Sequence, residues 1–171
     1  RTATYEALNI ARNSGAVISY DPNYRAALWS DPETAQLRMQ SLIPYVDMMK
    51  ISDEETSLLT PYQDPEEAIQ YLLLVAVTLG RDGALIGNEN GIVKAEGFSS
   101  HAVDTTGAGD SFWGGFLASY LQEETSPEHL TRAQMIQFGR VGNAVASLCV
   151  ERRGGISAIP EMEEIEERLR G

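Results

Sequence analysis

The sequence predicts an α/β protein built on a mainly parallel sheet with one antiparallel hairpin. From residue 16 onward, short apolar segments alternate with segments whose apolar residues recur at helical spacing. Helix-start signals, such as an acidic residue followed by Pro and Glu, lie between the apolar segments, and two further apolar segments flank a polar turn. The alternation is typical of a parallel sheet covered by helices, and the flanked turn is typical of a hairpin.

The first third of the chain predicts two helices and two strands. Residues 4–13 have the spacing of a short amphipathic helix, and the apolar residues 16–20 predict a buried strand. Asp31 followed by Pro32 caps a second helix, which runs to about residue 42. The next apolar segment, residues 46–51, predicts the second strand.

The middle of the chain predicts a third strand and the hairpin. Ser52 and Glu55 have the spacing of a capping box, so a helix is expected directly after the second strand. A further helix follows an Asp-Pro-Glu-Glu segment, and residues 72–79 hold its end and a buried strand. The hairpin pairs residues 83–87 with residues 91–95.

Three helices are predicted in the C-terminal third. Residues 112–123 carry apolar side chains at helical spacing, and residues 160–170 predict a final acidic amphipathic helix. The helix expected over residues 133–150 is rich in Gly, Ala and Ser. Small residues allow a flat ring to approach a helix, and close packing against a sheet explains them equally well.

The segment 104–112, Asp-Thr-Thr-Gly-Ala-Gly-Asp-Ser-Phe, carries the clearest chemistry. Gly107, Ala108 and Gly109 let the backbone turn sharply, and the helix N-terminus that follows favours an anion. Asp110 has the wrong sign for holding a phosphate. It suits a base that takes a proton from a hydroxyl while the backbone stabilises a transferring phosphoryl group. A plain helix cap is the structural alternative.

Other polar residues follow the remaining strands, where ligands gather in open α/β sheets. Asn23 and Arg25 follow the first strand, although a Pro-Asn turn would also explain them. Thr78 and Gly80 follow the third strand, where Gly80 also suits an ordinary turn. Asn143 lies in the helix rich in small residues, where a local hydrogen bond would account for it.

Composition excludes several classes of protein. With 43% hydrophobic and 22% charged residues the chain is ordinary for a globular protein, and its net charge of -12 argues against nucleic acid or an anionic membrane as a partner. The single cysteine, Cys149, excludes an internal disulfide. The longest apolar run, residues 71–77, is too short to span a bilayer, and no leader pattern opens the sequence. We therefore expect a cytoplasmic protein.

The segment 104–112 closely resembles the C-terminal signature of the ribokinase-like sugar kinases, the PfkB carbohydrate kinase family. Residues 21–25, Asp-Pro-Asn-Tyr-Arg, are similar to the Asp-x-Asn-x-Arg segment of fructokinases and 2-keto-3-deoxygluconate kinases. Ser52 to Glu55 resembles the family's Asn-x-x-Glu motif, with Ser in place of Asn. The resemblance covers the whole chain but only the second half of a family member, and the chain begins without Met.

This resemblance implies a ribokinase-like three-layer α/β/α fold that is incomplete here. Residues 1–171 are expected to be the C-terminal, nucleotide-binding and catalytic part, without the N-terminal sugar-binding part and its lid. The implied activity is ATP-dependent phosphorylation of a sugar hydroxyl, with fructose as the expected sugar. Phosphorylation of 2-keto-3-deoxygluconate or of another family substrate is the alternative, and a non-catalytic nucleotide-binding fragment is the alternative of another class.

The resemblance also implies a role for each candidate residue. Asp110 is the expected base, in contact with the sugar; Asn23 and Arg25 are expected beside the sugar and phosphate. Glu55 is expected to organise Mg²⁺ through water. The expected anion hole is Gly107, Ala108 and Gly109, and the expected nucleotide contacts are Thr78, Gly80 and Asn143 with Gly107 and Gly109.

Two further expectations follow from the resemblance. Asp104 and Thr106 match positions that hold a monovalent cation, usually K⁺, although Ala158 lacks the side-chain oxygen sometimes used further along. The partners expected are a small-molecule sugar and ATP, with no nucleic acid and no membrane. A homodimer through the lid is expected for the full-length protein.

Overall fold

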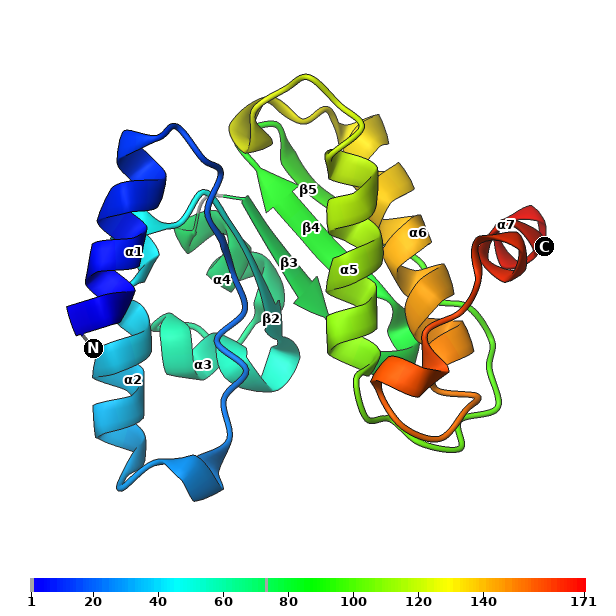
Figure 1. Cartoon of the computed structure of the whole chain (residues 1–171), viewed down its shortest axis with the longest axis horizontal. Coiled ribbons are helices and arrows are strands. Elements are labelled where there is room, and N and C mark those ends of the chain that lie inside the picture. Colours follow the sequence, from blue (N-terminus) through cyan, green and yellow to red (C-terminus); the bar gives the residue numbers. More distant parts are fainter. Residues whose placement is uncertain (1, 73) are drawn as a thin grey trace.

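The computed structural model describes residues 2–72 and 74–171, so Arg1 and Leu73 lie outside the described residues. Five strands form one mixed sheet in the order β1-β2-β3-β4-β5 (Figure 1). Three of them are parallel: β1 (Ser19–Tyr20), β2 (Met48–Ser52) and β3 (Leu74–Thr78). The hairpin of β4 (Ala84–Asn88) and β5 (Gly91–Ala95) pairs antiparallel to β3. The predicted α/β fold is confirmed.

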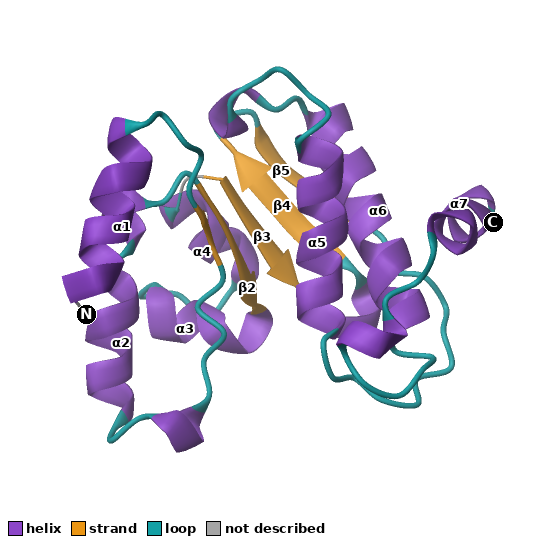
Figure 2. Cartoon of the chain, viewed as in Figure 1, coloured by secondary structure: helices purple, strands orange, loops and turns teal. Residues whose placement is uncertain are grey.

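Helices cover both faces of the sheet and make three layers (Figure 2). One face packs against α5 (Ala108–Tyr120) and α6 (Arg132–Cys149), and the other packs against α2 (Pro32–Gln40), α3 (Thr56–Leu59) and α4 (Pro65–Tyr71). Successive strand residues point to opposite faces, so neighbouring positions of β2 and β3 enter different cores. Burial on both faces explains why the two strands are apolar almost throughout.

The two terminal helices lie at the edges of these layers. The first, α1 (Thr2–Asn13), has no buried residue; its Tyr5 hydroxyl bonds to that of Ser41, and its Arg12 donates to the carbonyl of Pro44. The last, α7 (Met162–Arg170), packs on α6 through Ile165. No helix in the described part of the chain is both long enough and apolar enough to cross a membrane.

The first predicted strand is much shorter than expected, and it is not buried. β1 contains only Ser19 and Tyr20, and Val17 is 48% exposed. Asp47 binds both backbone groups of Ile18. The Asp47 carboxylate accepts the Ile18 N–H at 2.7 Å, and the Asp47 N–H donates to the Ile18 carbonyl at 2.9 Å. β1 is also an edge strand, so no strand of the described residues pairs with its outer side.

The helix expected after Ser52 is present, with its capping box, but it is short. A 3₁₀ turn over Asp53–Glu55 leads into α3, which has only four residues. Thr60 is extended and precedes Pro61, and a residue before proline disfavours the helical conformation. The remaining predicted helices and the hairpin are present, with bounds within four residues of those expected.

Candidate active site

A polar cavity of about 730 Å³ opens where the parallel strands end. Its walls are the loops after β1 and β2, the end of β3 and the N-terminal turn of α5. The structure brings most of the predicted site residues together in this cavity, namely Asn23, Arg25, Glu55, Thr78, Thr106, Gly107, Ala108, Gly109 and Asp110.

A smaller cavity of about 100 Å³ adjoins the first one, because Thr78, Ala108 and Gly109 line both. Gly80 and Asn143 line only the smaller cavity. The Asn143 amide donates to the carbonyl of Ala95 at 2.9 Å and to that of Glu96 at 3.0 Å, so it also tethers α6 to the end of β5. Of the predicted nucleotide residues, all but Gly107 thus line the smaller cavity, and Gly107 lines the larger one.

The N-terminal turn of α5 presents two unused backbone donors. The N–H of Ala108 donates to Thr105 at 3.2 Å and that of Ser111 donates to Gly107 at 2.8 Å, whereas those of Gly109 and Asp110 have no acceptor among the described residues. Unpaired donors at the positive end of a helix form an anion site. The Gly107 N–H likewise has no acceptor among the described residues, so within the expected Gly107–Gly109 set only the Ala108 donor is engaged, and Asp110 adds a further free donor.

The two glycines of this turn are needed for different reasons. Gly107 has a φ of 77°, a left-handed conformation that favours glycine. Gly109 has no positive φ, but a Cβ there would lie 2.9 Å from the Nζ of Lys50. Any larger residue at position 109 would have to displace that lysine.

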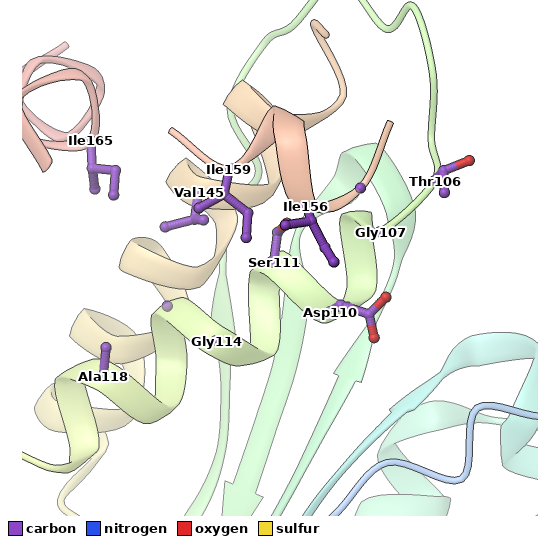
Figure 3. A pocket seen from close by; sticks show the side chains of 12 residues that line it. Thr106, Gly107, Asp110, Ser111, Gly114, Ala118, Val145, Ile156, Ile159 and Ile165 are labelled. Carbon is purple, nitrogen blue, oxygen red and sulfur yellow. The ribbon is translucent and has the colours of Figure 1, made fainter. Parts of the chain in front are cut away.

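Asp110 projects from the first turn of α5 (Figure 3). Its side chain is exposed, and its carboxylate has no hydrogen-bond partner within residues 2–72 and 74–171. A carboxylate without a partner, beside two free N–H donors, can accept a proton close to an anion site. An apolar groove of about 430 Å³ continues from Asp110 along α5 towards Ala118 and Ile165.

Two carboxylates hold the loop after β1. Glu55 is buried, with Oε1 accepting the Tyr24 N–H at 2.7 Å and Oε2 accepting the Ser52 N–H at 2.9 Å. Asp21 accepts the Asn23 N–H through Oδ1 at 3.1 Å and the Lys50 ammonium through Oδ2 at 2.9 Å. These bonds fix the backbone from which Asn23 and Arg25 face the cavity.

Asp104 lines neither cavity, but it holds the backbone of the turn that leads into the anion site. Its carboxylate accepts the N–H of Gly154 at 3.0 Å and that of Thr106 at 2.9 Å, which joins the turn before α5 to the turn after α6. These two hydrogen bonds, the Gly154 bond first, lower the pKa of Asp104 to about 2. Hydrogen bonds to the charged form have this effect because they stabilise it.

The carboxylates of this site could hold a magnesium ion only together with the phosphates of a bound substrate. Among the described residues no group of three or more His, Cys, Asp or Glu side chains could hold a metal ion. Both oxygens of Glu55 and of Asp104 already accept N–H donors. Mg²⁺ keeps several waters and binds through one or two carboxylates plus substrate phosphates, so it needs no protein cage here.

Lys50 is a buried residue of the larger cavity to which the sequence analysis assigned no role. It lies in the middle of β2, its side chain is 8% exposed, and it pairs with Asp21. The signal in the sequence is a lysine inside a mainly apolar strand, three residues before the turn that carries Glu55.

Comparison with known proteins identifies the family. Residues 1–162 match the model of the pfkB family carbohydrate kinases. The chain belongs to this family. Its relatives include "Probable fructokinase-4" of Arabidopsis thaliana, 34% identical over all of this chain and 54% of the relative. Fructokinase-2 of Solanum lycopersicum is also 34% identical, over all of this chain and 53% of that protein.

Solved structures of this family superpose closely on the chain. A double-mutant fructokinase from Vibrio cholerae O395, with fructose, ADP and a potassium ion bound, has a TM-score of 0.89 at 30% identity, covering 99% of this chain and 55% of that one. The fructokinase of Xylella fastidiosa with bound ATP has a TM-score of 0.86 at 26% identity, covering 98% and 56%. The predicted ribokinase-like fold is confirmed, and the chain spans about half the length of these pfkB relatives.

The family resemblance does not fix the compartment. One relative is named "Probable fructokinase-6, chloroplastic" of Arabidopsis thaliana, and it is 34% identical over 99% of this chain and 45% of the relative. The expected cytoplasmic location stays a prediction.

Proposed function

We propose that this chain is the nucleotide-binding and catalytic part of an ATP-dependent sugar kinase, with fructose as the sugar. One observation carries the proposal: the free carboxylate of Asp110 lies beside two unpaired N–H donors, its own and that of Gly109, at the mouth of a polar cavity. Proton acceptance and anion stabilisation are the two tasks of phosphoryl transfer to a hydroxyl.

In the proposed reaction, the Asp110 carboxylate takes the proton of a sugar hydroxyl. The hydroxyl oxygen bonds to the terminal phosphorus of ATP as the bond from that phosphorus to the ADP oxygen breaks. The N–H groups of Gly109 and Asp110, with the turn at Gly107 that aims them, stabilise the charge on the transferring group. Magnesium, when bound, neutralises phosphate charge.

The remaining predicted residues take supporting roles in this proposal. Thr78, Gly80 and Asn143 line the small cavity and would contact the nucleotide. Asn23 and Arg25, on the loop held by Glu55, would face the sugar and its phosphate. Because both Glu55 oxygens are engaged, Glu55 would act on magnesium through water.

The monovalent cation and the sugar are the finer parts of the proposal. A potassium ion in the Vibrio cholerae structure supports a K⁺ site near Asp104 and Thr106, to which backbone carbonyls would contribute. The fructokinase names of the relatives favour fructose over 2-keto-3-deoxygluconate.

We further propose that a separate N-terminal part supplies the lid and most of the sugar contacts. Two observations support this division: the chain spans about half the length of its relatives, and Ile156 and Ile159 in the apolar groove are 91% and 54% exposed (Figure 3). Without that part, residues 1–171 would be a nucleotide-binding half without turnover. Dimerisation through the lid would then belong to the full-length protein, in which both parts are joined.

Two experiments on the 171-residue chain test the proposal. In the first, ADP with Mg²⁺ is titrated into the chain in a calorimeter; in the second, the release of ADP is measured with ATP and fructose present. We expect weak but measurable ADP binding that Gly107→Val abolishes, because a branched side chain is strained at a φ of 77°. We expect no fructose-dependent release of ADP, because orientation of both reactants is worth about 7–11 kcal/mol of the barrier. Absence of ADP binding would contradict the nucleotide site, and robust fructose phosphorylation would contradict the division into two parts.

A further inference from the structure

Lys50, which is buried, forms an ion pair with the partly buried Asp21. The Lys50 side chain is 8% exposed and that of Asp21 is 18% exposed, with 2.9 Å between Nζ and Oδ2. Lys50 occupies a strand position on the same face as Met48, where an apolar residue would pack against α5. Replacing such a pair by apolar residues is often neutral or stabilising, so the pair is weak evidence for a structural role.

The position of the ammonium is unusual for a lysine. It lines the polar cavity and lies against Gly109. A Cβ in place of the Gly109 hydrogen would be 2.9 Å from the Lys50 Nζ and 3.4 Å from its Cε. The N-terminus of a helix carries partial positive charge, so a cation packed against it is unfavourable unless an anion lies nearby. Asp21 supplies one negative charge, and the donors of Gly109 and Asp110 have no acceptor among the described residues.

We propose that Lys50 binds the terminal phosphate of a nucleoside triphosphate, together with the N–H groups of Gly109 and Asp110. This inference rests on the proposed function and adds a residue that the sequence did not suggest. Asp21 holds the ammonium beneath the N-terminal turn of α5, and Gly109 leaves room for it. A nucleoside diphosphate lacks the group that Lys50 would contact, so the proposal separates the two ligands.

The competing explanation is that Lys50 only tethers the loop of residues 21–25 through Asp21. A tether would affect both nucleotides equally, because the same loop faces the cavity in either case. The test therefore compares two ligands on one variant: a non-hydrolysable ATP analogue and ADP, each with Mg²⁺, titrated into the full-length protein.

Lys50→Met removes the charge and keeps a long unbranched side chain. We expect the variant to bind the ATP analogue about 10- to 100-fold more weakly, as expected for losing a charged hydrogen bond, and to bind ADP as the wild type does. The matched control is Lys94→Met, because the Lys94 side chain is 44% exposed and pairs with the exposed Glu96. Equal losses for both ligands, or no loss for either, would overturn the proposal.

The wild-type protein provides a second measurement. The 171-residue chain contains two lysines, Lys50 and Lys94, so their Nζ resonances can be assigned by NMR with the Lys94 variant. We expect the ATP analogue to shift the Lys50 signal and ADP to leave it unchanged, with Lys94 unaffected by both. If the analogue binds without moving Lys50, the inference is wrong while the proposed function stands. If the wild type binds neither nucleotide, both are wrong.

Discussion

The carboxylate of Glu55 accepts the backbone N–H of Tyr24 across 2.7 Å, although the two residues follow different strands. The same carboxylate accepts the N–H and the hydroxyl of Ser52, at 2.9 Å and 3.2 Å. The buried Glu55 side chain thus caps the turn after β2 and also holds the loop after β1. The position of Asn23 and Arg25 in the cavity depends on this bond.

Glu55→Gln should destabilise the chain and loosen that loop. The amide keeps the shape of the carboxylate, but its NH₂ group would face either the Tyr24 donor or the Ser52 donors. Losing charge-assisted bonds and leaving a buried donor unpaired costs about 1–3 kcal/mol. Urea unfolding measures the loss, and hydrogen exchange at the Tyr24 amide measures the loosening.

The control for this prediction is Glu6→Gln, since Glu6 is exposed on α1, a helix without buried residues. If both variants unfold at the same urea concentration, the Glu55 carboxylate does not fix the loop.

Asp104→Asn should remove part of the pH dependence of stability. The pKa of Asp104 is lowered to about 2 in the folded chain, from an ordinary value of 3.8, by the Gly154 and Thr106 N–H groups. Asp104 therefore stabilises the fold above pH 4, and this contribution is lost as the pH falls towards 2. The difference in unfolding free energy between the wild type and the variant should be largest above pH 4 and should shrink towards pH 2. Denaturant titrations across that range measure it, and a difference independent of pH would contradict the prediction.

Two adjacent glycines of α5 should respond in opposite directions to alanine. A Cβ at Gly114 would meet no atom within 4 Å, whereas one at Gly115 would lie 2.9 Å from Val145 Cγ2 and 3.1 Å from the Gly142 Cα. Gly114→Ala should stabilise by about 0.5–1 kcal/mol through helix propensity. Gly115→Ala should destabilise by about 1–3 kcal/mol through overpacking. Thermal unfolding of the pair tests the packing of α5 on α6, and a shift of both variants in the same direction would contradict it.

Local sequence patterns were sufficient for most of the fold. The strands β2 and β3 are buried on both faces, so their mainly apolar segments, interrupted in β2 by Lys50, are visible in the sequence. The hairpin and the helix caps at Asp31 and Asp64 depend on residues close in sequence, so they could also be predicted from the sequence. The length of β1 was not, because it depends on Asp47, which lies 29 residues from Ile18.

The candidate site was predictable where its residues form a contiguous motif. Gly107, Gly109 and Asp110 belong to one such motif, and the structure places them at the mouth of the cavity. Lys50 was missed because its partners, Asp21 and Gly109, are distant in sequence and meet only in the folded chain. The reason for glycine at position 109 was missed with it.

The central claim is that Asp110 is the base for phosphoryl transfer, and Asp110→Asn in the full-length protein tests it most directly. The substitution removes the proton acceptor and leaves the N–H groups of Gly109 and residue 110 in place. Fructose-dependent ADP release at saturating fructose should fall about 10²- to 10⁴-fold, while the affinity for ADP with Mg²⁺ stays near that of the wild type. Turnover close to the wild-type value would show that Asp110 is only a carboxylate at a helix end, and would contradict the account.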